Sequence, residues 1–181
     1  ERKNLFLGLN YRMTELEAAM GRCQLRKLDR VVQQRRALAA ELARGIAGLR
    51  SVRPCTVIPG AVSSYWLYLL HVDTSALAVS KEQFARAVAA EGIPVDPHYD
   101  WIIYETPWIR QRANYGASGC PWTCPYYGKE VVYEGSCPNA RRAIDAHMVI
   151  HWHEGYSAAE IGAIAEALGK VESAYLAAGR A

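Results

Sequence analysis

The sequence lacks the long apolar runs and the strong charge that would assign it to a membrane or to nucleic acid. No stretch approaches the roughly 20 consecutive apolar residues of a membrane-spanning helix, and the opening residues ERKNLF have no apolar signal-peptide core. The formal net charge of +3 is small for 181 residues, so it indicates neither a nucleic-acid footprint nor an acidic partner. These absences predict a soluble, cytoplasmic protein without membrane or nucleic-acid partners.

Cysteine is too sparse and too irregular for a disulfide framework. The thiols are odd in number and unevenly spaced: Cys23, Cys55, Cys120, Cys124 and Cys137. The last three, with the histidines at 147, 151 and 153, make a weak zinc pattern, because Cys137 has no close second partner. We predict no metal site and expect the loop thiols to pack against Trp122 and Tyr126.

The glycines exclude two common nucleotide sites. Gly116, Gly119 and Gly128 are scattered, and they do not join a strand to a helix with the spacing of a dinucleotide fingerprint or a P-loop. None of the cysteines carries a local signature of a nucleophile paired with histidine. The chain therefore contains no complete catalytic motif of these kinds.

The apolar pattern predicts an α+β fold. Thr14 and Glu17 have the spacing of a capping box, and helical periodicity continues to about Leu49, as one long helix or two with a bend near Asp29. Aromatic and branched residues predict strands, and further caps predict helices. The remaining expected elements are a strand at 65–72, a helix starting after Ser80, an edge strand at 93–97, a loop at 99–136 with a helical turn at 107–112, a helix at 139–147, a strand at 148–152 and a capped helix at 157–178. Helices would then pack on a roughly three-stranded sheet.

Two polar positions are candidates for binding. Asn10, Tyr11 and Arg12 stand just ahead of the first helix, where backbone N–H groups and the helix dipole favour an anion. A local turn at Asn10, with Arg12 paired to Glu15, explains the same residues equally well. His98 follows the second strand, where side chains point into clefts, but a half-buried histidine bonded to a loop carbonyl is the competing interpretation.

Three stretches of the chain resemble one protein family. They are GLNYRMTELEAAMGRCQLRKLDRVVQQRR, GIPVDPHYDWIIYETPWI and the segment from Gly119 to Val171, in this order. Together they resemble the C-terminal portion of the DegT/StrS-like aminotransferases, which use pyridoxal 5'-phosphate (PLP) and act on keto sugars, sugar nucleotides and aminocyclitol precursors.

The resemblance implies the small C-terminal domain of a fold-type I aminotransferase that works as a homodimer with shared active sites. It implies that Asn10 contacts the phosphate of the partner subunit's PLP, and that Arg12, Tyr11 and His98 meet the substrate. The family's Schiff-base lysine precedes this motif, so the resemblance implies no catalytic residue here and an inactive fragment. The absence of an initiator Met agrees with a fragment.

The expected organisation is an interface segment at 1–53, linked to a large domain outside this sequence, and a small α+β domain at 54–181. The expected reaction moves an amino group from glutamate or glutamine to a keto sugar, sugar nucleotide or keto-cyclitol. The alternative is a non-catalytic α+β module that dimerises or binds a partner through the apolar face of residues 14–49.

Overall fold

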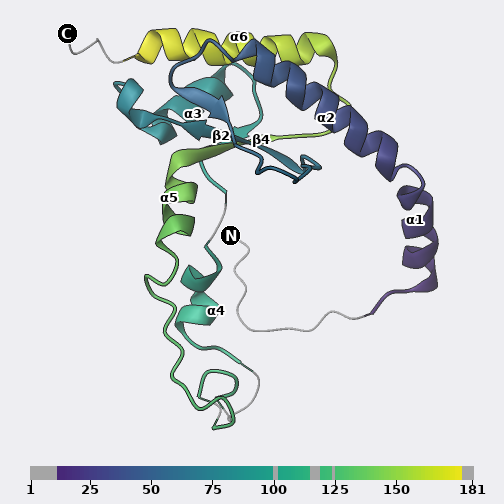
Figure 1. Cartoon of the computed structure of the whole chain (residues 1–181), viewed down its shortest axis with the longest axis vertical. Helices are drawn as coiled ribbons and strands as arrows, with labels where there is room; N and C mark the ends of the chain where they lie inside the picture. Colours follow the sequence, from purple (N-terminus) through teal and green to yellow (C-terminus); the bar gives the residue numbers. More distant parts are fainter. Residues whose placement is uncertain (1–11, 100–101, 115–118, 124, 177–181) are drawn as a thin grey trace. The chain divides into compact units, whose positions relative to one another are not determined.

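The computed structural model of the chain describes residues 12–99, 102–114, 119–123 and 125–176. Its backbone separates into two compact units, each of which is described by itself (Figure 1). The sheet unit comprises residues 15–99 and 145–181, and the loop unit comprises residues 1–14 and 100–144.

The sheet unit contains a four-stranded antiparallel sheet with the strand order β1-β2-β4-β3. The strands are β1 (Val52–Pro54), β2 (Leu67–Val72), β3 (Val95–Asp96) and β4 (His147–His151). The predicted strands at 65–72, 93–97 and 148–152 are confirmed, and β3 is at the edge, as its flanking prolines indicate. The expectation of three strands is wrong by one, because β1 is only three residues long and ends in a proline.

Helices pack on one face of this sheet. They are α2 (Leu28–Gly45), α3 (Lys81–Ala90) and α6 (Ala158–Tyr175). The sheet unit also contains α1 (Glu15–Leu25), which buries no residue, and a short 3-10 turn, η1, at Thr74–Ala76. Figure 1 shows α2 lying alongside α6 over the sheet. The helical pattern of residues 14–49 thus forms two helices in succession, separated at Arg26 and Lys27.

Two predicted helix starts are confirmed by their hydrogen bonds. Ser80 and Gln83 form a reciprocal capping box at α3, and Ser157 and Glu160 form another at α6. In each box the two side chains accept hydrogen bonds from two backbone N–H groups that the helix start would otherwise leave unpaired. The sequence alone therefore fixes where these two helices begin.

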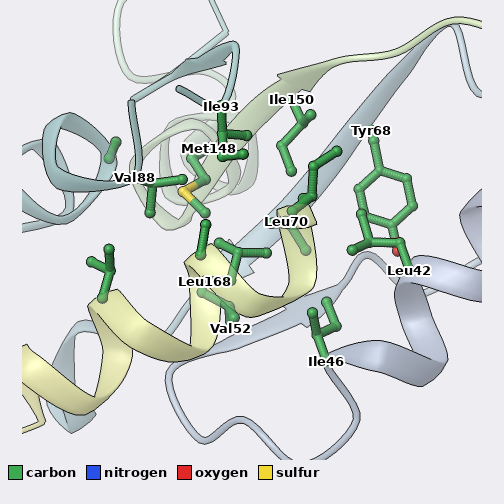
Figure 2. Close-up of a cluster of buried hydrophobic side chains, with 14 of the residues drawn as sticks. Leu42, Ile46, Val52, Tyr68, Leu70, Val88, Ile93, Met148, Ile150 and Leu168 are labelled. Atoms are coloured by element: carbon green, nitrogen blue, oxygen red, sulfur yellow. The ribbon is translucent and has the colours of Figure 1, made fainter. Parts of the chain in front are cut away.

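The core lies between the helices and the sheet (Figure 2). Alternate residues of β2 point into it, since Tyr68, Leu70 and Val72 are buried whereas Leu69 is partly exposed. Helices α2, α3 and α6 and strands β2 and β4 contribute almost completely buried side chains, among them Leu42, Leu70, Phe84, Val88, Met148, Ile150, Ile161 and Leu168. This apolar layer holds the sheet in place, and the opposite face carries both apolar residues, such as Leu69 and Val149, and polar ones.

One buried carboxylate joins α6 to the connection between α2 and β1. Glu172 is 4% exposed and accepts hydrogen bonds from the backbone N–H groups of Arg50 and Ser51, at 3.0 and 2.6 Å, and from the Ser51 hydroxyl. Buried carboxylates are stable only when such donors replace water. This contact fixes the start of β1 against the last helix.

The loop unit has little regular structure. It contains a 3-10 turn, η2 (Ile103–Glu105), the short helix α4 (Pro107–Arg110) and most of α5 (Pro138–Ala146), which runs directly into β4. The predicted turn at 107–112 and helix at 139–147 are confirmed. Trp122 is buried between the rings of Trp108 and Tyr133, with ring centroids 6.3 and 5.9 Å away. The expected packing of thiols on Tyr126 is wrong, because that ring is 97% exposed.

Across the described part of the chain, no helix has the length and apolar character needed to cross a membrane.

Candidate functional site

The residues predicted to bind cofactor and substrate are only partly described. Asn10 and Tyr11 lie outside the described residues. Arg12 is exposed just before α1 and makes no ion pair with any residue that the structure describes, Glu15 included. Arg12 belongs to the loop unit and His98 to the sheet unit, so each is placed by a different part of the fold.

His98 is exposed and follows the edge strand β3. It lies close enough to Glu82, in the first turn of α3, to contribute to that residue's electrostatics. The pKa of Glu82 is lowered by hydrogen bonds from its own backbone N–H and from Ser80, with a smaller contribution from His98. The competing interpretation, a half-buried His98 bonded to a loop carbonyl, does not agree with the sheet unit, because His98 is exposed there.

A histidine pair lies on the face of the sheet opposite the core helices. His71 of β2 and His147 of β4 are direct cross-strand partners, with ring centroids 5.3 Å apart in an edge-to-face arrangement. The Nδ1 atom of His71 is buried without a hydrogen-bond partner among the described residues. Burial, the nearby Arg53 guanidinium and His147 lower the pKa of His71, and Asp73 partly opposes them. His71 is therefore neutral at physiological pH.

A second polar pair lies where β3 meets β4. Nε2 of His151 is 2.7 Å from Oδ2 of Asp96, and both side chains are more than half exposed. Near the same strands the exposed rings of Trp66 and Tyr99 meet edge to face, 6.4 Å between centroids. The sequence analysis did not predict the His71–His147 pair or the Asp96–His151 pair, because each depends on the register of strands that are far apart in the chain.

Among the described residues, no group of three or more histidine, cysteine, aspartate or glutamate side chains is arranged to hold a metal ion. The two histidine pairs therefore lack the third ligand that a protein metal site requires.

The described lysines do not resemble a Schiff-base lysine. Lys81 is buried and donates to the carbonyl of His147 at 3.0 Å, which ties α3 to the start of β4. Lys170 is paired with Glu91 at 2.7 Å. Lys27 is exposed between α1 and α2, and Lys129 is exposed in the loop unit. A nucleophilic lysine needs an amine that is unengaged and desolvated, and none of these four combines both properties in the described structure.

The fold is that of part of an aminotransferase chain. PseC of Helicobacter pylori, an aminotransferase involved in the biosynthesis of pseudoaminic acid, matches with a TM-score of 0.67 at 18% identity over 93% of this chain and 40% of its own. DesV of S. venezuelae matches with a TM-score of 0.68 at 21% identity over 91% of this chain and 38% of its own. The PLP form of a putative sugar aminotransferase from Streptococcus pneumoniae matches with a TM-score of 0.60 at 20% identity, over 90% and 36%. The chain thus spans well under half the length of these proteins.

A family model gives the narrower assignment. The model of the DegT/DnrJ/EryC1/StrS aminotransferase family matches residues 1–132. The chain belongs to this family.

Proposed function

We propose that this chain is the C-terminal part of a cytoplasmic, PLP-dependent aminotransferase that moves an amino group from glutamate or glutamine to a keto sugar, sugar nucleotide or keto-cyclitol. The observation that carries the proposal is the family match over residues 1–132, together with an aminotransferase fold over about nine tenths of the chain. In this proposal residues 1–53 form the segment that links to the large domain, and residues 54–181 form the small domain.

The proposed roles of the site residues come from the family resemblance, and their chemistry is compatible with these roles. Asn10 donates its side-chain amide to the phosphate of the PLP in the partner subunit, which an amide can do without adding charge. Arg12, which has no ion pair in the described structure, is available to meet an anionic or polyhydroxylated substrate, with Tyr11 and His98 beside the same substrate. These roles are proposals that rest on the resemblance.

The cofactor supplies the electron sink for amino transfer, and the reaction also needs a lysine amine. Since the described lysines are engaged or lie on exposed surfaces, we propose that the Schiff-base lysine belongs to a part of the enzyme outside these 181 residues. The chain by itself is then inactive, and its contribution is to hold the phosphate and form part of the substrate wall.

Subunit complementation tests this proposal directly. The enzyme is made with its upstream coding region in two forms, one carrying Asn10→Ala and the other lacking the upstream Schiff-base lysine. Both are assayed at a PLP concentration too low to fill the weakened Asn10→Ala site, so that each form alone is inactive. In a mixed two-fold dimer, one site receives the lysine from one subunit and Asn10 from the other, so random mixing restores about a quarter of the wild-type activity. No recovery on mixing would refute the cross-subunit role of Asn10, and an upstream region without such a lysine would refute the aminotransferase assignment.

The affinity for PLP gives a second measurement. Loss of one hydrogen bond to a charged phosphate corresponds to about 1.5–3 kcal/mol, so Asn10→Ala weakens PLP binding by roughly 10-fold or more. Gln34→Ala, an exposed change on α2, is the control and leaves PLP binding unchanged.

One observation is compatible with the alternative of a non-catalytic module. Helix α1 has no buried residue, and apolar side chains of Met13, Leu16, Met20 and Leu25 are exposed on and beside it. Such a surface fits a partner or second copy as well as a large domain. A purified 181-residue chain that forms a defined dimer with a cooperative thermal transition supports the module, whereas a chain that aggregates supports a severed aminotransferase domain.

A further inference from the structure

His98 lies on a short segment that the backbone of the sheet does not hold. Strand β3 ends two residues before His98, is only two residues long and lies at the edge of the sheet. Pro97 follows the strand and has no N–H to donate. No hydrogen bond between described residues involves the backbone of His98 or Tyr99. The position of the His98 imidazole therefore depends on side-chain contacts of the residues around it.

An ion pair holds the start of this segment. Nε2 of His151, on β4, lies 2.7 Å from Oδ2 of Asp96, the last residue of β3. Asp96 is opposite Val149 in the strand register, so this contact runs diagonally to the next residue on the same face of β4. The backbone N–H of His151 also donates to the carbonyl of Pro94 at 3.0 Å. His151 thus binds the edge strand both just before its first residue and at its last.

A ring contact holds the other end of the segment. Tyr99 follows His98 directly and meets the ring of Trp66, which precedes β2, with 6.4 Å between the ring centroids. The rings are edge to face, which is a favourable arrangement for two aromatic side chains. Contacts that join different parts of the sheet unit therefore flank His98 on both sides along the chain.

Both contacts lie at the surface, so their effect is local. The side chains of Asp96 and His151 are 56% and 58% exposed, and the ring of Trp66 is 68% exposed. Exposed ion pairs contribute little to the free energy of unfolding. What such contacts do instead is to reduce the number of positions open to the residue between them, which here is His98.

We propose that His151 and Trp66 are positioning residues for His98: they fix the segment from Asp96 to Tyr99 so that the imidazole of His98 is presented to the substrate. The inference rests on the proposed function for the role of His98 itself. Without either contact, His98 spends a smaller fraction of time in the binding position, and the apparent affinity for the substrate falls by the same factor.

Steady-state kinetics of the longer enzyme, made with its upstream coding region, test the proposal. The acceptor probes are scyllo-inosose and dTDP-4-keto-6-deoxyglucose, of which the better acceptor is used, with glutamate as the donor. We expect His151→Leu to raise the acceptor KM about threefold and to leave the KM for glutamate unchanged. His151→Gln keeps an N–H donor near the place of Nε2 and retains the original acceptor KM. Lys170→Met is the matched control, because it removes another exposed ion pair of 2.7 Å and leaves both KM values unchanged.

A double-mutant cycle separates positioning from a merely structural role. In a His98→Ala enzyme there is no imidazole to position, so adding His151→Leu produces no further change of the acceptor KM. Trp66→Leu removes the second contact and raises the acceptor KM about twofold, which keeps a test available if His151→Leu does not fold. Additive effects in the cycle, or an unchanged acceptor KM in both His151→Leu and Trp66→Leu, would overturn the proposal.

Crystal structures of the same enzymes test the positioning without activity. We expect the B-factor of His98, relative to the mean of the sheet, to rise about twofold in His151→Leu and to stay unchanged in His151→Gln, because B is proportional to the mean-square displacement. If the enzyme fails to transaminate while His98 loses order in His151→Leu, the proposed function fails and the positioning contacts remain. If it transaminates with the order of His98 and the acceptor KM unchanged, the positioning proposal alone fails.

Discussion

Replacement of Glu172 by alanine gives the sharpest test of how the sheet unit is held together. The change removes a carboxylate that accepts two backbone N–H groups and one hydroxyl from Arg50 and Ser51. Ser51 is completely buried, so its N–H and hydroxyl lose their acceptor without access to water, whereas the N–H of exposed Arg50 can bond to solvent. Each buried donor left unpaired costs about 1–3 kcal/mol, so the two donors of Ser51 give a loss of roughly 2–6 kcal/mol.

That loss is a large fraction of the roughly 5–15 kcal/mol by which a domain is stable. Urea denaturation followed by circular dichroism at pH 7 measures it. Glu166→Ala is the matched control, because Glu166 is an exposed glutamate on the same helix and its change has the same effect on helix propensity. A difference of less than about 1 kcal/mol between the two variants would refute the reasoning, since it would mean that Ser51 is satisfied in another way.

The same carboxylate predicts a dependence on pH. Burial raises the pKa of Glu172, but the hydrogen bonds from Ser51 and Arg50 outweigh it and hold the pKa below its ordinary value. A depressed carboxyl pKa contributes stability that is present above the unfolded-state pKa of about 4.3 and is lost as the pH falls through the folded-state pKa. In Glu172→Gln this part of the acid sensitivity disappears, and denaturation series from pH 7 down to pH 3 would show a shallower slope than in the unmodified chain.

Three further predictions concern the sheet unit. Gly45→Ala destabilises the chain by about 1 kcal/mol or more, because a Cβ at this position would lie 2.9 Å from the Cβ of Ala165. Gly162→Ala, at an open position on α6, stabilises the chain by about 0.5–1 kcal/mol. Equal shifts of the melting temperature in the two variants would contradict this prediction. The pKa of His71 is lowered in the folded chain, so as the pH falls through about 6.5 the unfolded chain is protonated first and the folded state loses stability between pH 7 and 5. His71→Leu makes this loss smaller in paired urea titrations. An unchanged loss in the variant would contradict the prediction. Lys81→Met leaves the His147 carbonyl without its 3.0 Å donor and costs about 1–2 kcal/mol by urea denaturation, whereas exposed Lys170→Met costs less than about 1 kcal/mol; similar losses would show that the buried bond is not special.

Local signals in the sequence were sufficient for most of the regular elements. The caps at Ser80 and Ser157 need only residues three positions away, so they could be recognised without knowledge of the fold. The aromatic and branched run of β2 and the prolines around β3 likewise carry their information within a few residues. The α+β class and the edge position of β3 followed from these signals.

Strand β1 was not predicted, and the break between α1 and α2 was predicted only approximately, as a bend near Asp29. The three residues of β1 have too little apolar character to show a period, and only pairing with β2 makes them a strand. No glycine or proline marks Arg26 and Lys27, where the helical pattern is interrupted. Both features depend on contacts or geometry beyond the local window.

The sequence by itself determined the order of the elements, two helix starts and a resemblance that the family match over residues 1–132 confirmed, because each is written in neighbouring residues or in an ordered motif. Only the tertiary structure decided which charges and rings meet. Glu172 with Ser51, His71 with His147 and Arg141 with Glu105 are contacts between residues whose distance along the chain does not predict them. The physical reason is that strand register and helix packing, and not local propensity, set the short distances over which hydrogen bonds and ion pairs act.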